Sequence, residues 1–85
     1  MVDALGALGD PAAERPLLER LHDDEYVTVR VGAARALAEI GARDRGGGAA
    51  RALAGRIELA VRHETEPTVI AAARQAAADL RAKRP

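Results

Sequence analysis

The stretch from Asp24 to Gly41 constrains the fold of this chain more than any other part of the sequence. Read as a helix, it carries five apolar residues on one stripe. These residues are Val29, Ala33, Ala36, Leu37 and Ile40. Apolar residues that recur with the period of the α-helix form a face that must be buried against other elements. The stretch therefore predicts a core helix from about Val27 to Ile40, with Gly41 as its end.

The same helical spacing predicts three further helices, over about residues 12–21, 49–62 and 68–83. Their expected buried residues are Leu17, Leu18 and Leu21, then Leu53, Ile57, Ala60 and Val61, then Val69, Ala73, Ala76, Ala77 and Leu80. Pro16 requires the first of these helices either to start late or to kink. Residues 42–48 contain three consecutive glycines and are expected to form a loop. No strand pattern is found in the sequence, so an all-α fold is predicted.

The composition limits the size and the environment of the core. A chain of 85 residues is expected to form one small domain, residues 1–85. Tyr26 is the only aromatic residue, so the core must consist of Leu, Ile, Val and Ala. There is no cysteine for a disulfide or a thiolate metal site, and no apolar run of about 20 residues that could span a bilayer. The N-terminus lacks the basic region of a signal peptide, and a cytoplasmic protein without membrane attachment is expected.

An internal repeat links the predicted helices. At an offset of 40 residues, the apolar stripe of the central helix falls on that of the last helix, from Val29 on Val69 to Ile40 on Leu80. At an offset of 36, Leu17 falls on Leu53. The chain therefore divides into a half repeat (1–9), a first full repeat (10–41) and a second full repeat (42–85). Paired helices with a period of about 30–45 residues are typical of an α-solenoid.

The sequence resembles HEAT repeats in residues 4–11, in 17–21 and in the run from Asp24 to Gly41. It is most similar to the short bacterial kind, also called phycobilin-lyase-type repeats, and the resemblance covers nearly the whole chain. It implies an α-α superhelix, a HEAT-like solenoid of about two and a half helix-turn-helix repeats. It also implies a structural ladder between repeats formed by Asp24 and Arg30. The matching positions in the second repeat hold Glu64 and Ile70.

A concave face is the expected binding surface of such a solenoid. The resemblance implies that the second helix of each repeat lines it. By helical geometry, the residues opposite the buried stripes are Val31, Arg35, Ala38, Ala71, Gln75 and Ala78. The alternative is that these residues face only water or a neighbouring helix. An unidentified protein partner is therefore predicted, together with possible self-association through the solenoid ends.

Other functional classes find less support in the sequence. No catalytic residues and no cofactor are expected, and we predict that the chain is not an enzyme. His22 and His63 do not predict a metal site, because His63 to Pro67 departs from the HExxH pattern at the proline. A nucleic-acid-binding HEAT-like domain is an alternative, but the net charge is zero and only one aromatic ring is present. A further alternative is an accessory repeat subunit of a lyase-type enzyme.

Overall fold

The structure is a computed structural model that describes residues 11–43 and 48–82 of the chain. A 3-10 turn, η1 (Pro11–Ala13), leads into α2 (Glu14–Asp23). Three longer helices follow, α3 (Val27–Ala42), α4 (Gly48–Ala60) and α5 (Pro67–Ala82). No strand is present in these two ranges, and the all-α prediction is confirmed for them. The half repeat predicted for residues 1–9 lies outside the described residues, as does most of the predicted glycine loop.

The helix boundaries follow the local sequence closely, with one correction. Pro16 is the third residue of α2, where a missing N–H removes no helical hydrogen bond, so the late-starting alternative holds. Pro67 likewise begins α5. The prediction that Gly41 ends the central helix is wrong, because α3 continues to Ala42 and Gly41 is buried within it.

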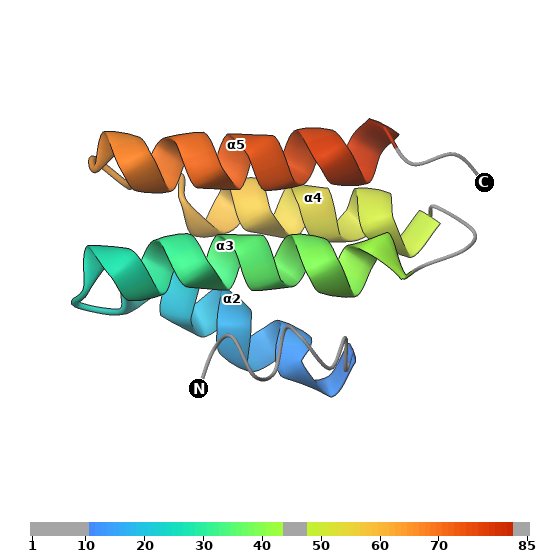
Figure 1. Cartoon of the computed structure of the whole chain (residues 1–85), viewed down its shortest axis with the longest axis horizontal. Helices are drawn as coiled ribbons and strands as arrows, with labels where there is room; N and C mark the ends of the chain where they lie inside the picture. The colour runs from blue at the N-terminus through green and yellow to red at the C-terminus, as the bar shows by residue number, and fades with distance from the viewer. Residues whose placement is uncertain (1–10, 44–47, 83–85) are drawn as a thin grey trace.

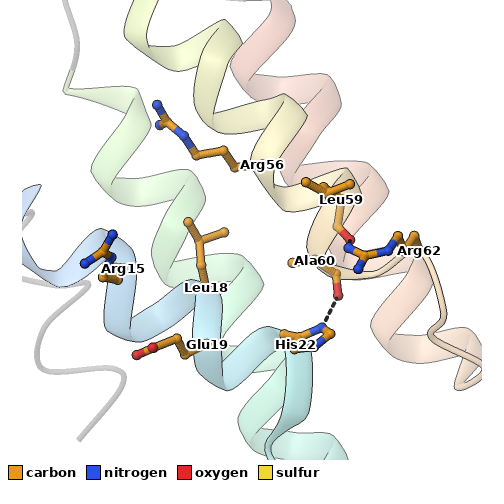
Figure 2. A pocket seen from close by; sticks show the side chains of 8 residues that line it. All are labelled: Arg15, Leu18, Glu19, His22, Arg56, Leu59, Ala60 and Arg62. Carbon is orange, nitrogen blue, oxygen red and sulfur yellow. Dashed lines mark hydrogen bonds between the residues drawn. The ribbon is translucent and has the colours of Figure 1, made fainter.

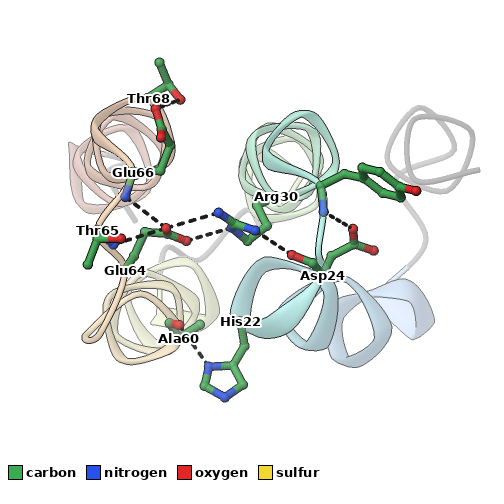
Figure 3. Close-up of polar contacts among 9 residues, drawn as sticks. His22, Asp24, Arg30, Ala60, Glu64, Thr65, Glu66 and Thr68 are labelled. Carbon is green, nitrogen blue, oxygen red and sulfur yellow. Dashed lines mark hydrogen bonds and ion pairs between the residues drawn. The ribbon is translucent and has the colours of Figure 1, made fainter.

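The four helices form two antiparallel pairs that stack side by side (Figure 1). α2 packs against α3, and α4 packs against α5. The two second helices, α3 and α5, are parallel: Arg30 near the start of α3 contacts Glu64 just before α5, and Gly41 near the end of α3 faces Leu80 near the end of α5. The helices therefore form two layers, α2 with α4 and α3 with α5, as the view along the helices in Figure 3 shows.

The core lies between these layers and consists of aliphatic side chains. Every residue predicted for the stripe of α5 is buried. Leu17, Leu21, Leu53 and Ile57 of the α2–α4 layer are also buried, at 2% exposure or less. In α3 the prediction holds from Ala33 onward, but Val29 is only partly buried, and Ala34, which was not predicted, is fully buried. Among the described residues, no polar or charged residue is buried in this core.

Small residues let α3 and α5 approach closely. Ala33, Ala34 and Ala36 of α3, and Ala73, Ala76 and Ala77 of α5, are all buried. At Gly41 the approach is closest: a Cβ atom there would overlap Cδ2 of Leu80 and would lie 3.3 Å from Cδ2 of Leu53. Gly41 is therefore required for the packing of α5 against α3 rather than for ending a helix.

Candidate interaction surfaces

Arg30 links the two helix pairs on the side where α3 and α5 begin (Figure 3). Its Nε donates a hydrogen bond to Oε1 of Glu64 at 2.8 Å, and its Nη2 donates to Oε2 at 3.3 Å. Its Nη1 donates to the backbone carbonyl of Asp24 at 2.6 Å. The side chains of Arg30 and Glu64 are only 15% and 8% exposed. One guanidinium thus joins the loop before its own helix to the loop before α5.

Glu64 also organises the turn that leads into α5. Its Oε2 accepts hydrogen bonds from the backbone N–H groups of Thr65, at 3.2 Å, and Glu66, at 3.1 Å. Burial alone would raise the pKa of this carboxyl. The hydrogen bonds from Glu66 and from Arg30 outweigh that effect, and the pKa of Glu64 lies below its ordinary value of about 4.5. Glu64 is therefore ionised in the folded protein near neutral pH.

The carboxylate of Asp24 has partners other than Arg30. Its Oδ1 accepts a hydrogen bond from the backbone N–H of Tyr26 at 2.9 Å, and its Oδ2 pairs with Nη1 of Arg20 at 3.3 Å. Arg30 reaches only the backbone carbonyl of Asp24. The charged partner of Arg30 is Glu64. The internal repeat aligns Glu64 with Asp24, but it does not predict that Glu64 contacts Arg30.

The lowered pKa of Glu64 predicts an acid-sensitive fold. A carboxyl whose pKa is lower in the folded than in the unfolded state contributes stability above its unfolded pKa. That contribution is lost as the pH falls through the folded pKa. We expect the unfolding free energy to decline as the pH falls below about 4.5, and Glu64→Gln to reduce this decline. Urea unfolding at a series of pH values measures it.

Glu58→Gln is the matched control for this experiment. Arg81 lowers the pKa of Glu58 through a side-chain hydrogen bond, but both side chains are about half exposed, so the pair should contribute little to stability. If Glu64→Gln retained the full acid sensitivity of the wild type, Glu64 would not be the group responsible.

The six residues predicted for a concave face lie on α3 and α5. Arg35, Ala71, Gln75 and Ala78 are exposed. Val31 and Ala38 are partly buried and pack against the core. Gln75 donates to Oδ1 of Asp79 on its own helix at 2.8 Å, and Arg35 has no hydrogen-bond or ion-pair partner among the described residues. The exposed positions among them are two alanines of α5 and one long polar side chain on each helix, Arg35 and Gln75.

A groove that the sequence did not predict lies in the other layer, between α2 and α4 (Figure 2). It has a volume of about 370 Å³ and an apolar floor that includes Leu18, Leu59 and Ala60. Leu59 is 60% exposed, and it is one of two large apolar residues that are exposed in the described part of the chain. The sequence feature that could have identified this groove is the position of Leu59, which lies outside the apolar stripe predicted for its helix.

The two histidines line one shallow pocket beside the end of α4. The Nδ1 of His22 lies 3.2 Å from the backbone carbonyl of Ala60, which can only accept, so Nδ1 carries the proton and donates. This bond joins α2 to the end of α4. His63 is exposed in the turn after α4. Within residues 11–43 and 48–82, no group of three His, Cys, Asp or Glu side chains is arranged to hold a metal ion.

Comparison with known proteins gives no match of the chain to a family model, a curated protein or a solved structure. Each helix in the described ranges is too short or too polar to span a lipid bilayer. The candidate surfaces must therefore be interpreted from their own geometry.

Proposed function

We propose that this chain is a HEAT-like helical-repeat module that binds a protein partner and catalyses no reaction. The observation that carries the proposal is a hydrogen-bond pattern that recurs after 40 residues. The carboxylate of Asp24 accepts from the N–H of Tyr26, and the carboxylate of Glu64 accepts from the N–H of Glu66. In both cases the acceptor and donor are two residues apart, directly before the second helix of a pair.

The backbone repeats the same arrangement. The carbonyl of Tyr26 accepts hydrogen bonds from Val29 and Arg30, and the carbonyl of Glu66 accepts them from Val69 and Ile70, each at 3.1 Å. Such backbone bonds occur at the start of any α-helix, so the distinguishing feature is the side-chain hydrogen bond just before each helix start, which recurs at a spacing of 40 residues. Recurrence of a turn together with the helix it starts supports a tandem repeat of one helix-turn-helix unit.

Arg30 supports the stacked arrangement of these units. It lies in the first unit and donates to Glu64 in the second, so its ion pair fixes the two units in register. Ile70 occupies the position that matches Arg30 in the second unit. It is partly buried beside Val61 and Ala73, at the edge where a third unit would pack. This edge supports self-association through a solenoid end as a secondary mode of contact.

The partner surface that we propose is the α3–α5 face, with Val31, Arg35, Ala38, Ala71, Gln75 and Ala78. Parallel second helices that lie side by side offer a broad surface that a protein can cover. Small side chains allow a partner backbone or helix to come close, and Arg35 is free to pair with a carboxylate. Arginine is enriched among the residues that dominate protein interfaces.

Site-specific photo-crosslinking tests this proposal. A photo-reactive residue at position 35 or 75 should form an adduct with a protein in extracts of the native cells. The same residue at position 51, which is exposed on α4 in the other layer, should not form that adduct. Arg35→Glu should reduce partner retention by about tenfold, the effect of losing one dominant interface residue, without changing the melting curve. Adducts that form only at position 51, or at none of the three, would contradict the α3–α5 face.

A further inference from the structure

The α2–α4 groove combines an apolar floor with a positively charged border. Leu18 of α2 and Leu59 of α4 lie on its two sides, with Ala60 between them and the end of α2 (Figure 2). Three arginines line it, against one glutamate, Glu19. An exposed leucine in a concave surface has a cost in water that a partner can remove by covering it. The groove therefore has the features of a docking site.

The charge of the border specifies what can dock there. Arg15 forms no hydrogen bond or ion pair with other described residues, so its guanidinium is available to a ligand. Arg62 donates one hydrogen bond, from Nη1 to the backbone carbonyl of Leu59 at 2.9 Å. Its other N–H groups are available to a ligand. Arg56 is committed to Glu14 at 2.6 Å. Two arginines, one at each end of the apolar floor, thus lack a carboxylate partner within residues 11–43 and 48–82.

The groove is also held in shape before any ligand binds. The hydrogen bond from His22 to Ala60 joins α2 to α4 along its side, and the Arg56–Glu14 pair joins the same two helices further along. A groove fixed from both helices loses little conformational freedom on binding. Its open form does not enclose a small molecule, but an amphipathic helix can lay its apolar face into such a groove.

We propose that the α2–α4 groove binds an acidic amphipathic peptide segment of a protein partner. Its apolar side chains cover Leu59 and Leu18, and its carboxylates pair with Arg15 and Arg62. This surface is in the layer opposite the α3–α5 face, so the inference does not depend on the function proposed for that face. Nucleic acid fits the groove less well, because Glu19 lies among its arginines, Arg56 is already paired with Glu14, and no Phe, Tyr or Trp side chain lines it for base stacking.

Selection from a random peptide display library tests the proposal with the intact chain. We expect the wild-type chain to enrich peptides with Leu, Ile or Phe at helical spacing and with Asp or Glu beside them. The selected peptide, made with a fluorescent label, should bind less tightly as salt is raised, because the ion pairs are exposed. Enrichment of peptides without acidic residues, or no enrichment at all, would overturn the proposal.

Three variants then assign the binding to this groove. Leu59→Ala and the double variant Arg15→Glu/Arg62→Glu should each weaken peptide binding at least about tenfold, as expected for dominant interface residues. Arg74→Glu, an exposed charge reversal on α5, should leave the affinity unchanged. All four altered positions are exposed, so folding should be retained, which circular dichroism checks. Equal losses in Arg74→Glu, or a labelled DNA duplex that binds more tightly than the peptide and competes with it, would refute the assignment.

Discussion

Leu37→Asp should unfold the described domain. Leu37 is 0% exposed and lies on α3, which packs against α2, α4 and α5. The substitution removes a buried aliphatic side chain, at a cost of about 2–5 kcal/mol, and buries a charge with no partner, which costs more. A domain of this size has a total stability of only about 4–13 kcal/mol. The expected result in far-UV circular dichroism is a large loss of helical signal and no cooperative melt.

Arg35→Asp is the matched control for that experiment. Arg35 lies two residues earlier on the same helix, but its side chain is exposed and has no ion-pair partner in the described ranges. A surface change of this kind should alter the unfolding free energy by about 0.5 kcal/mol or less. If Leu37→Asp melted like the wild type, the assignment of the buried face of α3 would be wrong.

Gly41→Ala should destabilise the protein even though alanine is the better helix former. The added Cβ would overlap Cδ2 of Leu80, which is 1% exposed and has little room to move. Overpacking of this kind costs about 1–3 kcal/mol, and the higher helix propensity of alanine offsets about 1 kcal/mol of it. We expect a net loss of up to about 2 kcal/mol, which corresponds to a fall of up to roughly 8–16 °C in Tm for a domain of this size.

Gly55→Ala makes the same chemical change where there is space for it. Gly55 is exposed within α4, and a Cβ there would have nothing within 4 Å. Its helix propensity gain should stabilise the protein by up to about 1 kcal/mol. The two substitutions are therefore expected to have opposite signs in urea unfolding. A gain from Gly41→Ala equal to that from Gly55→Ala would show that α3 and α5 are not in close contact at this position.

The helices and most of the core follow from the sequence because periodicity is a local signal. The stripe from Val69 to Leu80 is buried as predicted, and so are Leu17, Leu21, Leu53 and Ile57. Each of these residues lies on a helix that has a single apolar face, and that face must be buried. Pro16 and Pro67 mark helix starts for an equally local reason, the absence of an N–H donor.

Contacts between the helix pairs could not be predicted in the same way. A glycine after an apolar stripe is the usual sign of a helix end, and only the position of Leu80 across the interface shows that the glycine at position 41 is needed for close packing instead. The partner of Arg30 depends on the register of the two pairs, and that register places Glu64 beside its guanidinium. The repeat in the sequence aligned Glu64 with Asp24, but alignment of equivalent positions does not show which of them touch.

The α2–α4 groove was missed because its residues have no common periodic pattern. Leu59 is a single apolar residue on the polar side of α4, and Arg15 is on α2, far away in the sequence. A solvent-exposed leucine is by itself ordinary in a folded protein. Only the packing of α2 against α4 shows that Leu59 lies in a concave surface with arginines at its ends.

Nuclear Overhauser spectroscopy of the labelled protein tests most directly the claim that two helix-turn-helix units stack in parallel. Parallel stacking should give cross-peaks between the α protons of Gly41 and the methyl groups of Leu80, at matching ends of α3 and α5. Cross-peaks from Gly41 to the methyl groups of Val69, at the opposite end of α5, would mean that the two helices are antiparallel. That result would contradict both the repeat and the surfaces derived from it.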